Sequence, residues 1–450
     1  METVGGVETV VGVEAMETVV LYHHSVWVQH MGYFDDERFL DEYIIADRGV
    51  LKPEHPPEKL EERDEELEAY VKLLRPLLKG WDLDNIFLYG HSGVGKTVAT
   101  RTLLPDLRET ATTQSLAVDL IEINCSAANT SYQSAIEIIN EVRNPGYPLT
   151  TLNLEKAELS KTGYPAEHVY DELFADLNDG ADNIILVLDE VNTLGTDSEL
   201  LYQLTRAQTM QKLDAELCLI GISNDFNFRD DLPTRVKDTL CETELHFPAY
   251  QHGDLISILS RRAEQAFYEG TYSTGVLELC AAMASRDRGS ARQAIRLLRK
   301  AAELAENEAV ETQTTDCIED HHVRTAEERI EQQQVATGIR TLTTHRKYIL
   351  LAVTNLAAHG QTPAQTRAIY EYYTTVAQDS GREPLTRRGM HEHLLEMCDN
   401  GILHNVNREQ RERGRPNQYA LDTPLETVLT ALEQEDGEIG DLDSLRDAAT

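Results

Sequence analysis

The sequence predicts an α/β protein in which helices cover a parallel β-sheet, followed by an all-helical unit and a small unit of helices with a β-hairpin. Three observations support this fold class. Short apolar runs alternate with longer helical patterns between residues 85 and 247, residues 252–308 show helical periodicity alone, and a strand-turn-strand pattern ends the segment 342–421. Strands that alternate with helices form parallel sheets covered on both faces.

The length and composition indicate a folded protein of several domains. At roughly 150 residues per domain, 450 residues suggest about three. The six cysteines are far apart and form no CxxC pair, which argues against a zinc ribbon or a disulfide framework. No run of about 18 apolar residues is present, so we expect no membrane span. The first thirty residues contain no Lys or Arg, so we expect no signal peptide, and we expect a cytoplasmic protein.

The charge is strongly negative and unevenly distributed. The net charge is −37, and arginine is preferred, with 11 Lys against 30 Arg. This composition is typical of extreme halophiles, because molar salt screens carboxylates over about 3 Å and lets them keep the surface hydrated. We therefore expect the sign of the whole chain to say little about its partners.

Each element follows from a local pattern. Residues 1–33 are expected to form a disordered tail, with Met31 as an alternative start, and EERDEELEAYVKLLRPLL (61–78) predicts an amphipathic helix. The acidic, Gln-rich segment 309–341 is expected to be a helical connector, and residues 422–450 an acidic tail. Five apolar runs predict strands at residues 85–90, 118–124, 183–191, 216–224 and 243–247.

A phosphate-binding loop follows the first strand. Residues 90–97 form a full GxxxxGK(S/T) motif between an apolar run and a helical pattern. In such loops the glycines turn backbone N–H groups toward phosphates, the lysine reaches the β- and γ-phosphates, and the hydroxyl ligates Mg²⁺. The expected ATP and Mg²⁺ site consists of Gly90, His91, Ser92, Gly93, Val94, Gly95, Lys96 and Thr97.

The carboxyl ends of two later strands supply further candidates. Asp189 is expected to hold the metal ion with Thr97, and Glu190 to polarise the attacking water. The alternative is that this acidic pair only ends a buried strand. Asn224, at the end of the next strand, is a candidate for orienting water, although asparagine at a strand end is more often a turn residue.

The helical segment contributes one arginine to this site. Arg292 follows a Gly-Ser pair that marks a helix start, and it is expected to reach the phosphates. Arg296 and Arg299 lie on the following turns of the same pattern, and we expect both to be solvated.

These residues resemble AAA+ ATPases, and among them the archaeal initiators related to the eukaryotic origin recognition complex and its helicase-loading partner. The resemblance extends from Phe34 to Leu421. It is most specific in KLEERDEELEAYV (59–71), FRDDLPTRVKDTLCETELHFPAY (228–250) and RGSARQAIRLLR (288–299). It implies an AAA+ base domain over residues 34–250 and a helical lid over residues 251–308.

The resemblance also implies roles for individual residues. Arg63 and Tyr250 would lie near the adenine, and Asn224 and Arg292 would be the two sensor residues. Arg235 would be an arginine finger that reaches a neighbour's nucleotide.

Two features qualify these roles. The alternative for Arg235 is a solvated side chain beside Asp231 and Asp238. The family often has a further acid two residues after Glu190, where this chain has Asn192. We therefore expect metal binding to be retained and hydrolysis to be slow.

The segment 342–421 has the pattern of a nucleic-acid-binding unit. Its net charge is +2, whereas the rest of the chain sums to −39. A helix that begins near Arg387 precedes a hairpin with an arginine-rich turn, which is typical of a winged helix: the helix enters the major groove and the wing contacts the backbone or minor groove. A winged helix that binds protein is the alternative. The DNA-binding candidates are Arg387, Arg388, Arg408, Arg411, Arg413 and Arg415.

Together these features predict an ATP-dependent replication initiator. It would bind double-stranded origin DNA, self-associate on it, and help to load the replicative MCM helicase, with ATP as a conformational switch and slow hydrolysis as the reset. Two alternatives remain: a paralogue that regulates through DNA binding without loading a helicase, and a protein-remodelling AAA+ ATPase.

Overall fold

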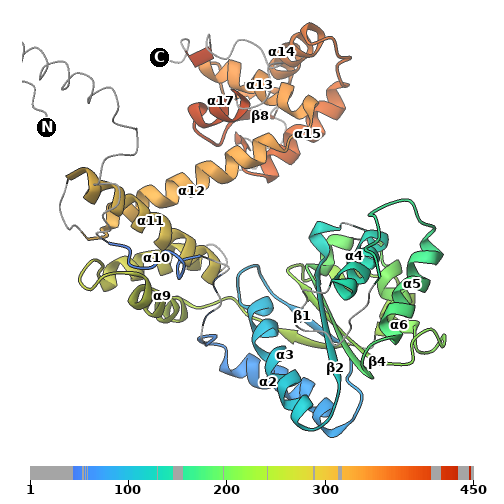
Figure 1. Cartoon of the computed structure of the whole chain (residues 1–450). Helices are drawn as coiled ribbons and strands as arrows, with labels where there is room; N and C mark the ends of the chain where they lie inside the picture. The colour runs from blue at the N-terminus through green and yellow to red at the C-terminus, as the bar shows by residue number, and fades with distance from the viewer. Residues whose placement is uncertain are drawn as a thin grey trace, which may run out of the picture. The chain divides into compact units, whose positions relative to one another are not determined.

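The computed structural model describes the chain as two units, residues 1–323 and 324–450, and each is considered by itself (Figure 1). The predicted tail over residues 1–33 and the wing residues Arg408, Arg411, Arg413 and Arg415 lie outside the described residues. The described residues are 44–52, 55, 57, 59–128, 130–144, 156–195, 197–240, 242–286, 289–312, 317–406, 417–433 and 445–446.

A five-stranded parallel sheet lies at the centre of the first unit, in the order β2-β3-β4-β1-β5 (Figure 1). Tyr89 pairs with Ser223 on one side and His246 on the other, so the carboxyl ends of these strands lie at one edge. All five predicted strands form, and the parallel fold class is confirmed. The strands are β1 (Ile86–Tyr89), β2 (Val118–Asn124), β3 (Asn183–Asp189), β4 (Glu216–Ser223) and β5 (Thr243–His246).

Helices cover both faces of this sheet. Ile184 and Leu186 of β3 face the core beneath α4, α5 and α6, whereas Ile185 and Val187 face the core beneath α2 and α3, because successive side chains of a strand point to opposite faces. The helices are α2 (Asp64–Leu74), η2 (Arg75–Lys79), α3 (Lys96–Thr113), η3 (Cys125–Ala127), α4 (Ser131–Arg143), α5 (Ala166–Asn178), η4 (Val191–Leu194), α6 (Glu199–Arg206), α7 (Phe228–Asp231) and α8 (Thr234–Leu240).

Three helices, α9 (His252–Ala266), α10 (Thr274–Arg286) and α11 (Ala291–Thr312), form the lid. The segment 44–51 packs on them, which differs from the predicted boundary that placed it in the base (Figure 1). The buried carboxylate of Glu306 accepts the N–H groups of Ile44 and Ile45 at 2.8 and 3.0 Å. Burial of both isoleucines on the lid explains the difference.

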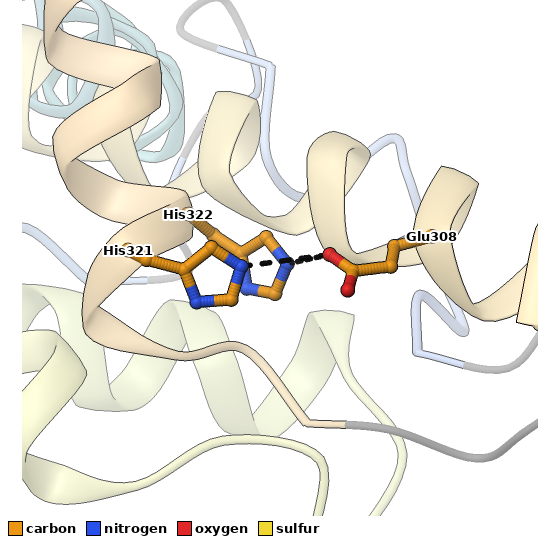
Figure 2. A group of neighbouring side chains, drawn as sticks. All are labelled: Glu308, His321 and His322. Atoms are coloured by element: carbon orange, nitrogen blue, oxygen red, sulfur yellow. Dashed lines mark hydrogen bonds and ion pairs between the residues drawn. The ribbon is translucent and has the colours of Figure 1, made fainter.

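A histidine pair ties α11 to α12 (Asp320–Arg340), and Figure 2 shows both rings pointing toward Glu308. The Nδ1 of buried His322 accepts the N–H of Glu319 at 3.0 Å, so the proton of the neutral ring lies on Nε2, which donates to Glu308 over 2.8 Å. Contacts with His322 and His321 lower the pKa of Glu308. Both ring nitrogens of His322 therefore form hydrogen bonds within the protein. The cluster connects α11 to the start of α12, and His322 offers no unpaired nitrogen to a metal ion.

The connector differs from the predicted range 309–341 at its start. α11 continues to Thr312, and the connecting helix α12 begins at Asp320. None of the helices within the described ranges is long and apolar enough to cross a membrane.

The second unit combines helices with a small antiparallel sheet in the order β6-β8-β7. The predicted helix after Thr386 forms, and the two predicted strands that follow it pair in antiparallel fashion; the turn between them lies outside the described residues. Residues 425–433 are a helix whose Val428 and Leu429 are buried in the same core as α13, so the unit extends beyond the predicted end at Leu421. The elements are α13 (Thr344–Ala358), β6 (Ala364–Gln365), α14 (Thr366–Asp379), α15 (Arg387–Asp399), β7 (Leu403–Asn405), β8 (Gln418–Leu421) and α17 (Leu425–Glu433).

Candidate nucleotide site

The phosphate loop connects β1 to α3 in a backbone conformation that requires glycine. Gly90, Gly93 and Gly95 have φ values of 152°, 79° and 101°. A Cβ at Gly90 would lie 2.2 Å from the carbonyl oxygen of Phe247, and one at Gly93 would lie 2.1 Å from Ser290 Oγ. These positions therefore exclude side chains by space as well as by backbone conformation. Ser92, Gly93, Gly95, Lys96 and Thr97 line the cavity described below.

The ammonium group of Lys96 is buried at the mouth of this loop. Its Nζ donates to the carbonyl oxygens of Gly90 and His91 at 2.7 and 2.9 Å. Burial lowers its pKa to about 8, against an opposing effect of Asp189. Neutral carbonyls compensate a buried cation only in part, so an anion in the loop would stabilise the charged lysine.

Two oxygen ligands for a hard cation lie side by side behind the loop. Thr97 Oγ1 donates to Asp189 Oδ2 over 3.0 Å, although the two residues are 92 positions apart. The other Asp189 oxygen accepts the N–H of Glu190 at 2.9 Å. Burial raises the pKa of Asp189, which means that its carboxylate would gain from a nearby positive charge. A hydroxyl and a carboxylate in this arrangement fit Mg²⁺.

The ends of β3 and β4 are joined by a side chain that the sequence analysis did not assign to the site. Asn192 Oδ1 accepts Ser223 Oγ at 3.2 Å and the N–H of Asn224 at 3.4 Å. Glu190 and Asn224 both line the cavity, and Glu190 has a φ of 54°. Asn192 therefore retains the acceptor function of an acid at this position without its charge.

The start of α11 lies directly on the phosphate loop. The N–H of Ala291 donates to the Gly93 carbonyl at 3.1 Å, and Nη1 of Arg292 lies 3.5 Å from Ser92 Oγ. Arg296, one turn further on, also lines the cavity, which differs from the expectation that it is solvated. Arg299 forms an ion pair with Glu303.

A cavity of about 810 Å³ lies between the base and the lid. Tyr250 lines it, but Arg63 does not. Arg63 is buried behind Tyr250 with its guanidinium carbon 3.7 Å from the ring centroid, and it donates to the carbonyls of Pro248 and Val94. It therefore supports Tyr250 and the phosphate loop from behind instead of facing the cavity.

Residues of α9 and of the N-terminal segment complete the cavity and were missed by the sequence analysis. Arg261, Arg262 and Gln265 line it together with Leu60. Arg262 also donates to the carbonyls of Val50 and His55. The three α9 residues carry no motif, and only their i, i+3 and i+4 spacing could have suggested a shared face, whereas Leu60 belongs to the segment 59–71 that the sequence analysis singled out.

Arg235 does not line this cavity. Its side chain is 57% exposed, with Nη2 3.5 Å from Glu199 and the guanidinium carbon 4.8 Å from the ring centroid of Tyr202. The guanidinium is thus available to a group outside its own nucleotide cavity.

In the second unit, Arg387 and Arg388 are exposed in the first turn of α15. Thr386 caps this helix by accepting the N–H of Gly389 at 3.2 Å. Arg388 is 90% exposed and makes a surface ion pair with Glu392. Such pairs contribute little stability, so the side chain can exchange its partner.

The fold and the site define an AAA+ ATPase domain with a helical lid, joined to a winged-helix domain. Residues 84–225 match the AAA domain family, residues 256–328 the Cdc6 AAA+ ATPase-type lid domain, and residues 337–431 the C-terminal winged-helix domain of CDC6.

The chain belongs to the ORC1-type, or Orc1/Cdc6, family of DNA replication initiation proteins. It is 42% identical to ORC1-type DNA replication protein 15 of Haloarcula marismortui, covering 90% of this chain and 96% of the relative. Its identity to ORC1-type DNA replication protein 10 of Halobacterium salinarum is 41%, covering 86% and 92%. The structure of the Aeropyrum pernix ORC1 protein in complex with DNA is similar, with a TM-score of 0.73 and 33% identity over 88% of this chain and 98% of that one.

Proposed function

We propose that this protein binds origin DNA under the control of ATP and helps to load the replicative MCM helicase. One observation carries the proposal: the same chain has a cavity lined by the phosphate loop and a winged-helix unit, and it resembles a protein whose structure was determined in complex with DNA. The winged helix contacts double-stranded DNA through α15 and the wing, and the nucleotide bound in the cavity controls its affinity for DNA.

The residues of the cavity have separable roles in this proposal. Lys96 and the loop N–H groups bind the phosphates, and Thr97 and Asp189 hold Mg²⁺, which when bound neutralises phosphate charge. Glu190 orients the attacking water, and Asn224 contacts the γ-phosphate or that water. An uncharged Asn192 beside Asn224 supports slow turnover.

The contact of α11 with the phosphate loop supports a switch. Arg292 lies on the lid, while Ser92 and Gly93 lie on the base. A nucleotide between them would contact both parts, so ATP and ADP would favour different lid positions if Arg292 contacts the γ-phosphate. Slow hydrolysis would then reset the protein.

Variants of Lys96 and Glu190 test this proposal. Lys96→Ala should weaken ATP binding strongly, because it removes the buried cation that contacts the phosphates. Glu190→Gln should bind ATP as the wild type does and lose turnover, because it acts on the water alone. Nucleotide titration, phosphate release and binding to an origin duplex are measured for each protein.

The expected DNA result links the two halves of the chain. With ATP present, Glu190→Gln should hold origin DNA at least as well as the wild type, and Lys96→Ala should hold it less well. Equal loss of ATP affinity in both variants would show that Glu190 has a different role. ATP-independent binding in all three proteins would show that the switch is absent.

We also propose that Arg235 acts as an arginine finger on ATP bound by a second copy of the chain. Its exposure and its absence from the lining of its own cavity support a role in trans. An arginine supplied in this way stabilises the charge that develops during phosphoryl transfer.

A further inference from the structure

One tyrosine ring contacts two arginines at the junction of α6 and α8. The guanidinium carbon of Arg235 lies 4.8 Å from the centroid of the Tyr202 ring, and that of Arg206 lies 5.4 Å from it. The Tyr202 hydroxyl accepts Nη1 of Arg206 at 2.8 Å. The hydroxyls of Thr205 and Thr239 meet at 2.9 Å and join the two helices at the same junction.

The ring of Tyr202 has a fixed place. It packs against the hydrophobic core beneath α6, and Arg206 holds its hydroxyl at the outer end. A guanidinium plane stacks well on an aromatic face, and this contact needs no partner of opposite charge. Tyr202 therefore presents a rigid surface to the flexible side chain of Arg235.

The ion pair of Arg235 is a weaker restraint on its position. Nη2 lies 3.5 Å from Glu199, whose side chain is 41% exposed. Exposed pairs of this length contribute little, and the salt that an acidic protein of this kind tolerates screens them further. The aromatic contact sets the direction in which the guanidinium extends from α8.

We infer that Tyr202 is a positioning residue that holds Arg235 ready for the phosphates of ATP bound to a second copy of this chain. The inference rests on the proposed role of Arg235. A long arginine side chain loses rotamer freedom when it engages a phosphate, and a side chain that is already held loses less. An exposed cation–π contact corresponds to about a two- to fivefold change in population, which sets the size of the expected effect.

Mixing two variants isolates the action of one chain on the other. A chain with Arg235→Ala keeps its own nucleotide site, and a chain with Lys96→Ala keeps Arg235 but lacks tight nucleotide binding. The two are mixed on a duplex long enough for two copies, and ATP turnover is measured. Turnover above that of either variant alone is expected, because Arg235 of one chain then serves the site of the other.

Changes at Tyr202 are then introduced only into the Lys96→Ala chain. Tyr202→Leu keeps apolar volume and removes the ring, and it should lower kcat of the mixture about two- to fivefold. KM for ATP should not change, since Arg235 is proposed to act on the charge that develops during phosphoryl transfer and not on ATP binding. Tyr202→Phe keeps the ring and should stay within twofold of Tyr202. Tyr268→Leu, in the lid, is the matched control and should leave turnover unchanged.

The outcomes separate this inference from the proposal on which it rests. Wild-type turnover by Arg235→Ala alone, or no recovery in a mixture shown to co-occupy the duplex, overturns the role of Arg235. If ATP turnover recovers equally whether the Lys96→Ala chain carries Tyr202 or Tyr202→Leu, the positioning role of Tyr202 is overturned and the role of Arg235 stands. Melting temperatures are measured first. If the leucine variant does not fold, a fivefold or larger loss with Tyr202→Phe still contradicts the inference.

Discussion

Replacing Gly93 by alanine should prevent the lid from closing on the phosphate loop. The added methyl would lie 2.1 Å from Ser290 Oγ and 3.0 Å from Cβ of Arg292. Both neighbours belong to the start of α11, so either the lid would have to move or the Ser290 hydroxyl would have to rotate away from the Gln293 N–H that it accepts. The residue would also keep a φ of 79°, which is unfavourable for alanine whether the lid is closed or open.

The two costs act on different equilibria. The backbone cost of about 1–2 kcal/mol lowers the stability of the base. The overlap acts only on the closed lid, where it breaks the Ala291–Gly93 hydrogen bond, worth about 0.5–1.5 kcal/mol. If Arg292 contacts the phosphates as proposed, the overlap also removes that charged contact, worth about 1.5–3 kcal/mol. ATP affinity should therefore fall by about 2–4.5 kcal/mol, or about thirty- to two-thousandfold.

A double variant separates the overlap from the backbone cost. Ser290→Gly alone removes the hydroxyl that the methyl would meet and should be nearly silent, because glycine before a helix costs only a few tenths of a kcal/mol. Gly93→Ala with Ser290→Gly should recover about tenfold of the lost affinity. Titration with a fluorescent ATP analogue measures all four proteins. Wild-type affinity in Gly93→Ala, or the same loss in the single and double variants, would refute the reasoning.

Two further predictions concern salt and DNA. The net charge of −37 should make the fold depend on salt, so the melting temperature should rise between 0.1 M and 2 M salt; a flat or falling melting temperature would contradict the adaptation inferred from composition. Replacing Arg387 and Arg388 by alanine should reduce the preference for origin over random duplex, since base contacts carry about 1–3 kcal/mol each. Replacing the three arginines within residues 411–415 should instead weaken binding to all duplexes and flatten the salt dependence by about 0.9 per phosphate contact; wild-type behaviour of both sets would favour a protein-binding winged helix.

The sequence predicts those parts of the structure that local patterns specify. Residues 184–188 are an unbroken apolar run, which is typical of a buried parallel strand. The motif at residues 90–97 predicts its own backbone, because glycine adopts positive φ most readily and Gly90, Gly93 and Gly95 all have it. The Gly-Ser pair before Arg292 predicts a helix start close to the phosphate loop, and Nη1 of Arg292 lies 3.5 Å from Ser92 Oγ; the sensor role of Arg292 stays a prediction from the resemblance.

Long-range packing is the part that the sequence did not predict. Arg63 lies behind Tyr250 because the carbonyls of Pro248 and Val94 accept from it, and no local pattern relates these residues. Residues 44–51 pack on the lid, where Glu306 accepts two of their backbone N–H groups. The acid and these N–H groups are 261 and 262 positions apart, so no local pattern predicts the contact. The acidic composition of residues 422–450 predicts a tail, but the apolar positions of α17 are buried in the core of the second unit.

The central claim is that this protein binds origin DNA under the control of ATP. The most direct measurement maps chromosomal occupancy of the wild type and of Lys96→Ala in the organism that encodes them. We predict discrete peaks at replication origins for the wild type and much weaker peaks for Lys96→Ala. Occupancy confined to promoters, no discrete sites, or equal peaks for both proteins would contradict the claim.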